Sequence, residues 1–254
     1  MCLVAFSWKT HQQYPLIIST NRDEFFDRPS LPMSQWESGF YAGKDLKSGG
    51  TWMGYHPNGR WSLLTNYRDF SKPRIAEISR GKLVENWLES QISAQDYLEK
   101  IRKNQHKYDG FNLLVSDGDN LYYFSNFSSE IKEVKPGIYG LSNGFLNDPW
   151  PKVELAKQQL KDLTNSDFTT TDLLTILKSR ETYPKENLPK TSVPLEMETA
   201  LSSQLIRMNG NYGTVSAAAV VQHKSGMVHL KQRTYQWDPE HYSDLDFQFQ
   251  LEQT

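Results

Sequence analysis

The chain has 254 residues, of which 37% are hydrophobic and 23% charged, and its formal net charge is -2. Basic and acidic residues are interspersed, which gives no reason to expect nucleic acid or an acidic membrane as a partner. A single cysteine excludes an intramolecular disulfide framework. No apolar run approaches the roughly 20 residues that span a bilayer, and the N-terminus lacks a secretory signal pattern. We expect a cytoplasmic protein with one domain over residues 1–254.

The cysteine, Cys2, directly follows the initiator methionine and opens the apolar run 2–6. Because residue 2 is small, we expect methionine aminopeptidase to remove Met1. A thiol with a pKa of about 8.5 and a free α-amine with a pKa of about 7.7–8.0 would then belong to one residue, which carries a nucleophile and its base. A small buried thiol on an opening strand would also pack well without any chemistry. Both interpretations of Cys2 stay open on this residue alone.

The first half of the chain is predicted to alternate between strands and one helical pair. Apolar runs between turn residues indicate strands at 2–8, 15–21, 51–55 and 61–66. Between residues 81 and 104 the apolar spacing becomes helical, which predicts a helical hairpin whose second helix is capped by Ser93. Strands then return at 111–115, 120–127, 131–134 and 138–141, with a hairpin turn at 117–119.

The second half is predicted to contain two helices, a long loop and a hairpin. Pro151 can open the first helix, and Thr171 or Asp172 can cap the second. Residues 183–198 hold three prolines and little periodicity, so we expect a loop there that can wall a site. A final hairpin is predicted from strands at 212–221 and 227–234, followed by an acidic tail with aromatic residues over 237–251. This order indicates an α+β protein with two stacked antiparallel sheets sandwiched by helices.

A charged tetrad, Asn-Arg-Asp-Glu, follows the second predicted strand at residues 21–24. An arginine near Cys2 would favour its thiolate, and a carboxylate would orient the α-amine and hold its proton. Two adjacent antiparallel strands would bring Arg22 and Asp23 to the start of the chain. A charge cluster at a strand end can also be merely solvated, so the tetrad alone leaves both interpretations open.

Two asparagines, Asn66 and Asn143, each follow an apolar strand in the pattern Leu-Thr/Ser-Asn. A thiolate that attacks a carbonyl creates an oxyanion, which amide donors at strand ends are suited to stabilise. Asparagine at a strand end is also a common turn former. The six histidines form no His-x-x-x-His or His-x-His pair, and although His223 and His229 flank one turn, we expect no metal site and no cofactor.

Several short motifs occur in a specific order along nearly the whole chain. They are Cys2, 21–24 with Arg28 and Pro29, 49–52, 64–69, 111–114, 122–126, 140–144 and 212–214. Together they resemble the NRDE family, also called the transport-and-Golgi-organisation type and named for the tetrad. That family looks like a branch of the N-terminal-nucleophile hydrolases, with an αββα four-layer sandwich. It is similar in layout to the choloylglycine and penicillin V acylases, which cleave amides with an N-terminal cysteine.

The resemblance implies that Cys2 is nucleophile and base, with Arg22 and Asp23 as the charged pair beside it. It implies that Asn66 and Asn143 serve the oxyanion and the amine. We also expect three residues from its motifs to bind substrate, namely Trp52, Tyr67 and Arg68.

This sequence departs from the pattern at two places. The acylases space their arginine and aspartate three apart, whereas Arg22 and Asp23 are adjacent, so Glu24 is an alternative catalytic carboxylate. Many relatives have an arginine where this chain has Val215, and Arg207 is a candidate replacement for that charge.

Two functions of different classes follow. The first is an amidohydrolase that cleaves a non-peptide C–N bond of a small linear amide through an acyl-Cys2 intermediate. The second is a haem- or lipid-handling protein on the same fold, since family members are linked to both ligands and fold does not fix function. In that case Cys2 would serve as an axial haem ligand.

Overall fold

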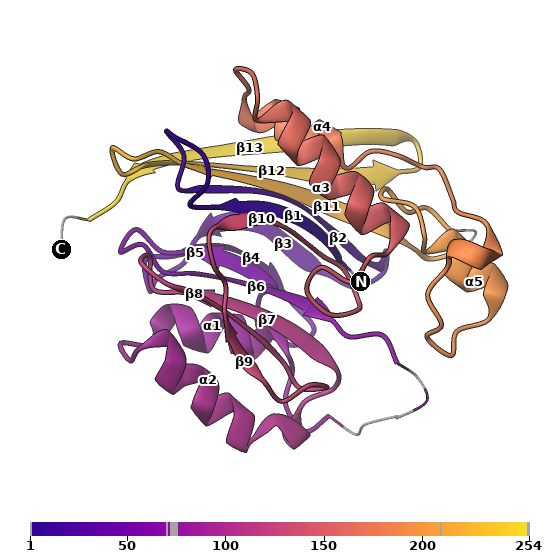
Figure 1. Cartoon of the computed structure of the whole chain (residues 1–254), viewed down its shortest axis with the longest axis horizontal. Helices are drawn as coiled ribbons and strands as arrows, with labels where there is room; N and C mark the ends of the chain where they lie inside the picture. Colours follow the sequence, from indigo (N-terminus) through magenta and orange to yellow (C-terminus); the bar gives the residue numbers. More distant parts are fainter. Residues whose placement is uncertain (1, 70, 72–75, 209, 253–254) are drawn as a thin grey trace. The chain divides into compact units, whose positions relative to one another are not determined.

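The structure is a computed structural model that describes residues 2–69, 71, 76–208 and 210–252. The chain divides into two compact units, residues 1–27 with 136–250 and residues 28–135 with 251–254. Each unit holds an antiparallel sheet that packs against helices (Figure 1). The expected α+β class with two antiparallel sheets is therefore confirmed.

The sheet of the first unit joins strands from both ends of the chain. Within the described residues it has six strands in the order β10-β1-β2-β11-β12-β13, so that β2 pairs with β1 on one side and with β11 on the other. The strands are β1 (Cys2–Trp8), β2 (Leu16–Phe25), β10 (Gly137–Leu141), β11 (Tyr212–Gln222), β12 (Met227–Trp237) and β13 (Glu240–Gln250).

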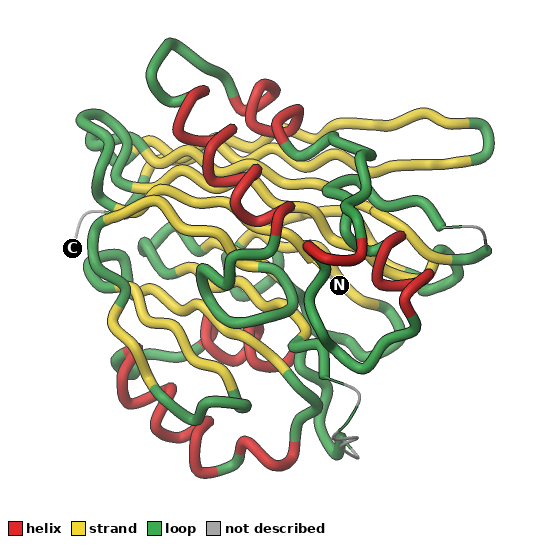
Figure 2. The backbone as a smooth tube through the Cα atoms, turned by 45° about the vertical axis from the view of Figure 1, so that its right-hand side comes forward, coloured by secondary structure: helices red, strands yellow, loops and turns green. Residues whose placement is uncertain are grey.

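Helices α3 (Pro151–Leu163) and α4 (Thr170–Ile176) pack on one face of this sheet (Figures 1 and 2). Alternate strand residues such as Leu3 and Ala217 form a buried cluster with the apolar sides of both helices. The unit also contains a short 3-10 turn (Lys185–Asn187) and helix α5 (Leu195–Ala200).

The sheet of the second unit follows the chain order. Its seven strands in the described residues run β3-β4-β5-β6-β7-β8-β9. Helices α1 (Gly81–Glu89) and α2 (Ala94–Lys103), with a 3-10 turn (Gln105–Lys107), pack on one face around Trp87 and Leu98. The strands are β3 (Ser30–Gln35), β4 (Tyr41–Asp45), β5 (Met53–Tyr55), β6 (Trp61–Asn66), β7 (Phe111–Ser116), β8 (Leu121–Ser125) and β9 (Ile131–Glu133).

Helix boundaries follow their capping chemistry. Ser93 caps α2 as predicted, because its hydroxyl accepts the backbone N–H of Asp96 at 3.1 Å. The predicted cap of α4 was wrong: Thr169 caps it and forms a capping box with Asp172. Pro151 opens α3 at its first turn, as predicted.

Three other predictions need correction. β2 continues through the tetrad to Phe25 instead of ending at residue 21. The predicted acidic tail is the strand β13, which pairs with β12. Two of its carboxylates form ion pairs with basic residues of β12: Asp244 with Arg233 at 2.7 Å and Asp246 with Lys231 at 3.1 Å. The predicted loop at 183–198 contains the start of α5, whose buried residue is a glutamate and therefore gave no apolar signal.

Strands β3 and β4 were not predicted. All residues of β3 except Met33 are exposed, so the sequence shows no alternation there. In the described part of the chain, no helix is long and apolar enough to cross a membrane.

Candidate functional site

The predicted site residues divide between the two units. Cys2, Arg22, Asp23 and Asn143 belong to the first unit, and Asn66 belongs to the second with the three expected substrate-binding residues.

Strand register brings the first group together. Cys2 pairs with Arg22 across β1 and β2, and Arg22 pairs with Ser216 across β2 and β11. Residues directly opposite each other share a face of a sheet, so these three side chains lie on the face opposite the one that packs on α3 and α4. Asp23, the next residue, pairs with Thr214.

The tetrad is not a solvated charge cluster. Asn21, Arg22 and Asp23 are all buried, and the side-chain amide of Asn21 donates to the carbonyls of Leu177 at 2.9 Å and Gln204 at 3.0 Å. Asn21 thus ties β2 to the segments that follow α4 and α5, which is a structural role.

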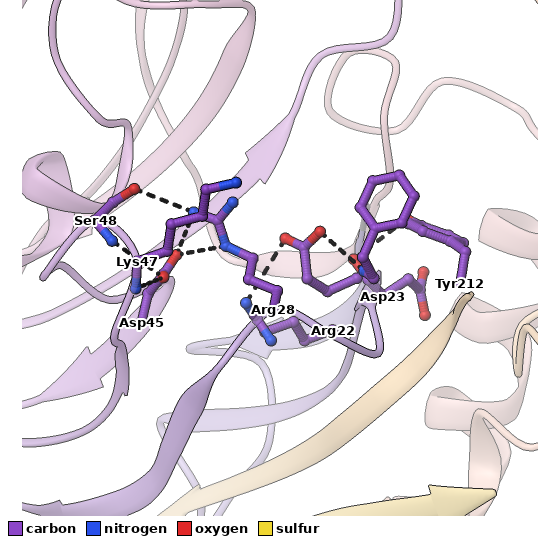
Figure 3. A network of polar contacts seen from close by, with 9 residues as sticks. Arg22, Asp23, Arg28, Asp45, Lys47, Ser48 and Tyr212 are labelled. Carbon is purple, nitrogen blue, oxygen red and sulfur yellow. Dashed lines mark hydrogen bonds and ion pairs between the residues drawn. The ribbon is translucent and has the colours of Figure 1, made fainter.

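The two carboxylates of the tetrad have different surroundings. Glu24 keeps 22% of its side chain exposed and lies 3.7 Å from the guanidinium of Arg22. Asp23 is buried, and its Oδ1 accepts the hydroxyl of Thr214 at 2.7 Å (Figure 3 shows the Arg22, Asp23 and Tyr212 side chains). Of the two, Asp23 is the buried carboxylate and the one whose charge acts on Cys2.

Opposing effects act on the pKa of Asp23. Burial raises the pKa above its ordinary value, while the positive amino end of the chain, Lys152, the Thr214 hydroxyl and Arg22 lower it. These surrounding cations and the hydroxyl are the groups that stabilise the buried carboxylate.

Burial also dominates the chemistry of Cys2, which is only 6% exposed. Burial and the charge of Asp23 raise the pKa of the thiol, whereas the amino end, Arg22 and a backbone hydrogen bond from Asp23 lower it. Arg22 lowers the pKa of the thiol, as expected, but the net direction is upward because desolvation outweighs the arginine. A thiol of this kind needs a base to become a nucleophile.

Asn143 lies beside the first residue of β1. The pairing of Val4 with Leu141 sets the register of β10, and the next residue, Ser142, donates its hydroxyl to the carbonyl of Cys2 at 3.0 Å. Asn143 is fully buried. The following Gly144 has no room for a side chain, because a Cβ there would collide with the carboxylate of Asp148.

The residues of the second unit have defined local roles. Trp52 is half-buried and its carbonyl accepts the N–H of Leu64 at 2.8 Å, and Asn66 is half-buried at the end of β6. Tyr67 stacks on Phe127 with ring centroids 4.1 Å apart, and Arg68 is buried. Their catalytic and substrate-binding roles stay predictions.

Arg28, from the motif that follows the tetrad, has a structural partner in the same unit. Its guanidinium donates to Asp45 through Nε at 2.8 Å and Nη2 at 2.5 Å, and Nη2 also reaches the hydroxyl of Ser48 (Figure 3). This pair fixes the start of β3 to the end of β4, so it organises the sheet.

Lys152 was missed by the sequence reasoning. It is 2% exposed in the first turn of α3, and its ammonium donates to the carbonyl of Leu201 at 2.8 Å. Its spacing of four and eight residues from the buried Ala156 and Leu160 could have shown that it lies on the buried side of the helix.

The structure also shows the surroundings of Val215, where this chain departs from the family pattern, and of Arg207. Val215 is half-buried and is the extra residue of a β-bulge between the pairs made by Thr214 and Ser216. Arg207 donates to the carbonyl of Trp237 at 2.8 Å and lies over its ring, with the guanidinium carbon 5.2 Å from the centroid. The candidate replacement for the missing arginine is thus engaged with Trp237.

Histidine chemistry is local. The Nδ1 atom of His223 lies 2.7 Å from the hydroxyl of Ser225 in its own turn. Among the described residues there is no group of three or more histidine, cysteine, aspartate or glutamate side chains that could hold a metal ion.

Comparison with known proteins places these motifs in a family. The family model described as Transport and Golgi organisation 2 matches residues 1–237. The mouse Transport and Golgi organization 2 homolog is 34% identical over 71% of this chain and 73% of its own length. The human and bovine homologs are each 29% identical over 99% of this chain and all of their own length.

Among solved structures, a Caenorhabditis elegans ortholog of N-acylethanolamine-hydrolyzing acid amidase is similar with a TM-score of 0.47 and 12% identity. The similarity covers 87% of this chain and 92% of that one. From the match over residues 1–237, the chain belongs to the Transport and Golgi organisation 2 family.

Proposed function

We propose that the chain is an N-terminal-nucleophile amidohydrolase that cleaves a non-peptide C–N bond of a small linear amide through Cys2. The proposal requires removal of Met1, a residue that lies outside the described part of the structure. The substrate is a small molecule, and the reaction needs only the amide and water.

The observation that supports this function best is the register of three strands at one end of the first sheet. Cys2 faces Arg22, and Asp23, which follows Arg22, is bound by Thr214 of the next strand. In the proposed function, the α-amine that removal of Met1 leaves on Cys2 has the buried carboxylate of Asp23 as its partner. Burial of a guanidinium and a carboxylate beside a thiol in one strand pair costs free energy, and such clusters of buried ionisable groups are typical of functional sites.

Acylation follows from these surroundings. The α-amine of Cys2 takes the proton from its own thiol, and the carboxylate of Asp23 stabilises the ammonium that forms. The sulfur then attacks the carbonyl carbon of the substrate, and a side-chain N–H of Asn143 is the proposed donor to the oxyanion. Collapse breaks the C–N bond, the ammonium returns its proton to the leaving nitrogen, and an acyl-thioester remains on Cys2.

Deacylation reverses the roles of the same groups. The α-amine removes a proton from water, which attacks the thioester, and the sulfur leaves and regains a proton as the carboxylic acid is released. The part of Asn66 as a second donor rests on the family resemblance alone.

Intact mass spectrometry tests the proposal. Protein incubated with a panel of N-acyl amides should lack Met1 and gain the mass of the acyl group on Cys2, and hydroxylamine should remove that mass. Cys2→Ala and a variant with glutamate inserted after Met1, which leaves the thiol but removes its α-amine, are the controls. Retention of Met1 in most molecules would contradict the proposal. Saturable binding of amides without acylation would instead favour the haem- or lipid-handling class.

A further inference from the structure

Thr214 is held by each of its polar atoms. Its N–H donates to the carbonyl of Ile206 at 2.8 Å, and its own carbonyl accepts the indole N–H of Trp237 at 2.8 Å. Its hydroxyl accepts the N–H of Ile206 at 2.9 Å and lies 2.7 Å from the Oδ1 atom of Asp23. The residue is also buried, so neither its backbone nor its rotamer is free to change.

These contacts fix the direction of the Thr214 hydroxyl proton. A hydroxyl has one proton and two lone pairs, and the N–H of Ile206 uses one of the lone pairs. An ionised Asp23 can only accept, so towards the carboxylate the Thr214 hydroxyl is the donor. Because a hydrogen bond donated to a carboxylate favours the charged form, Thr214 stabilises Asp23 as an anion.

The whole Tyr-Gly-Thr motif supports this arrangement. The hydroxyl of Tyr212 donates to the backbone carbonyl of Asp23 at 3.2 Å. A Cβ on Gly213 would lie 2.5 Å from the carbonyl oxygen of Ile206, so only glycine allows β11 to approach that segment. The motif holds both the main chain and the side chain of Asp23.

Lys152 supplies a buried positive charge to the same carboxylate from the helix side of the sheet. Its ammonium is held by the carbonyl of Leu201, in the segment between α5 and β11. The charged side chains that act on Asp23 thus come from separate elements: Arg22 from β2 and Lys152 from α3.

We propose that Thr214 is a positioning residue for the proposed reaction, and this inference rests on that function. Thr214 fixes one oxygen of Asp23, and the buried Lys152 adds positive charge to the surroundings of the carboxylate. Asp23 can then hold the proton on the α-amine of Cys2 while the thiolate attacks. Thr214 acts on the reaction through Asp23.

The test compares Thr214→Val, which keeps the shape but lacks the hydroxyl, with Thr214→Ser, which restores the hydroxyl. Carbon-13 NMR of labelled aspartate carboxyls, with Asp23→Asn to assign the signal, follows the ionisation of Asp23 against pH. In Thr214→Val the pKa of Asp23 should rise, and Thr214→Ser should return it towards the wild-type value. Lys152→Met should raise this pKa as well, and Lys152→Arg should preserve the charge. Circular dichroism checks that each variant is folded.

In Thr214→Val and Lys152→Met, the acid side of the pH–rate profile of acylation, measured by intact mass, should move to higher pH. For Thr214→Val, the acylation rate on that side of the profile should fall by about 10-fold. An unchanged Asp23 titration in folded Thr214→Val, or failure of Thr214→Ser to restore it, would overturn the role of Thr214 even if the enzyme is active. An altered titration in a protein that acylates with no amide would support the positioning of Asp23 and reject the proposed function.

Discussion

Substitution of Gly213 by alanine should destabilise the first unit because the new methyl group meets backbone. Its Cβ would lie 2.5 Å from the carbonyl oxygen of Ile206 and 2.9 Å from the ring of Phe26. Overpacking of this kind costs about 1–3 kcal/mol. Separation of Ile206 from Thr214 would also weaken two hydrogen bonds, each worth about 1 kcal/mol. With both hydrogen bonds lost, we expect a total loss of about 3–5 kcal/mol, which corresponds to a fall in Tm of roughly 6–20 °C for a chain of this size.

Thermal unfolding followed by circular dichroism measures this loss, with Gly137→Ala as a matched control in the same unit. There the nearest obstacle is the ring of Tyr139 at 2.8 Å, which belongs to a half-buried side chain stacked on Phe6 and not to the backbone. The control should therefore lose less than about 1.5 kcal/mol. A Gly213→Ala protein as stable as the wild type, or less affected than the control, would refute the close approach of β11 to Ile206.

Further predictions concern charge and catalysis. Because burial raises the pKa of Asp23 in the folded protein, stability should fall as pH rises from the unfolded-state value of 3.8 through the raised folded value. Asp23→Asn should lack that fall, which urea unfolding across this range measures. Asn143→Ala, and on the family resemblance Asn66→Ala, should each slow acyl transfer by about 10²–10³-fold; unfolding of either variant, seen by circular dichroism, would identify a turn former instead. Val215→Arg should lower the pKa of Cys2, read from alkylation rate against pH; an unmoved pKa in a folded protein would separate position 215 from the thiol.

Elements with apolar periodicity could be predicted closely from the sequence. The strands at Cys2–Trp8 and Trp61–Asn66 have the predicted bounds, and Ser93 caps its helix. In each case the signal is local, because burial of one face repeats with the period of the element. Sequence reasoning also anticipated that adjacent antiparallel strands bring Arg22 to Cys2.

Polar strands could not be predicted, because distant partners make them stable. The tetrad continues β2 since Asn21 and Asp23 bind residues that are 156 to 191 positions away. No local pattern reports such partners. For the same reason, the sequence does not reveal that Thr214 and Lys152 act on Asp23. Their surroundings form only when β2, β11 and α3 have assembled.

The strand order of the first sheet also determines how long β2 waits for its partner β11 during synthesis of the chain. β1 and β2 end at Phe25, but β11, their partner in the sheet, begins at Tyr212. At about 5–20 residues per second, a ribosome needs roughly 10–40 s to add the intervening residues. During that time β2 lacks its partner β11, while the segment 28–135, which forms most of the second unit, has already been synthesised. If Cys2 is the nucleophile, as proposed above, this interval is the time in which aminopeptidase can reach the amino end before β11 pairs with β2.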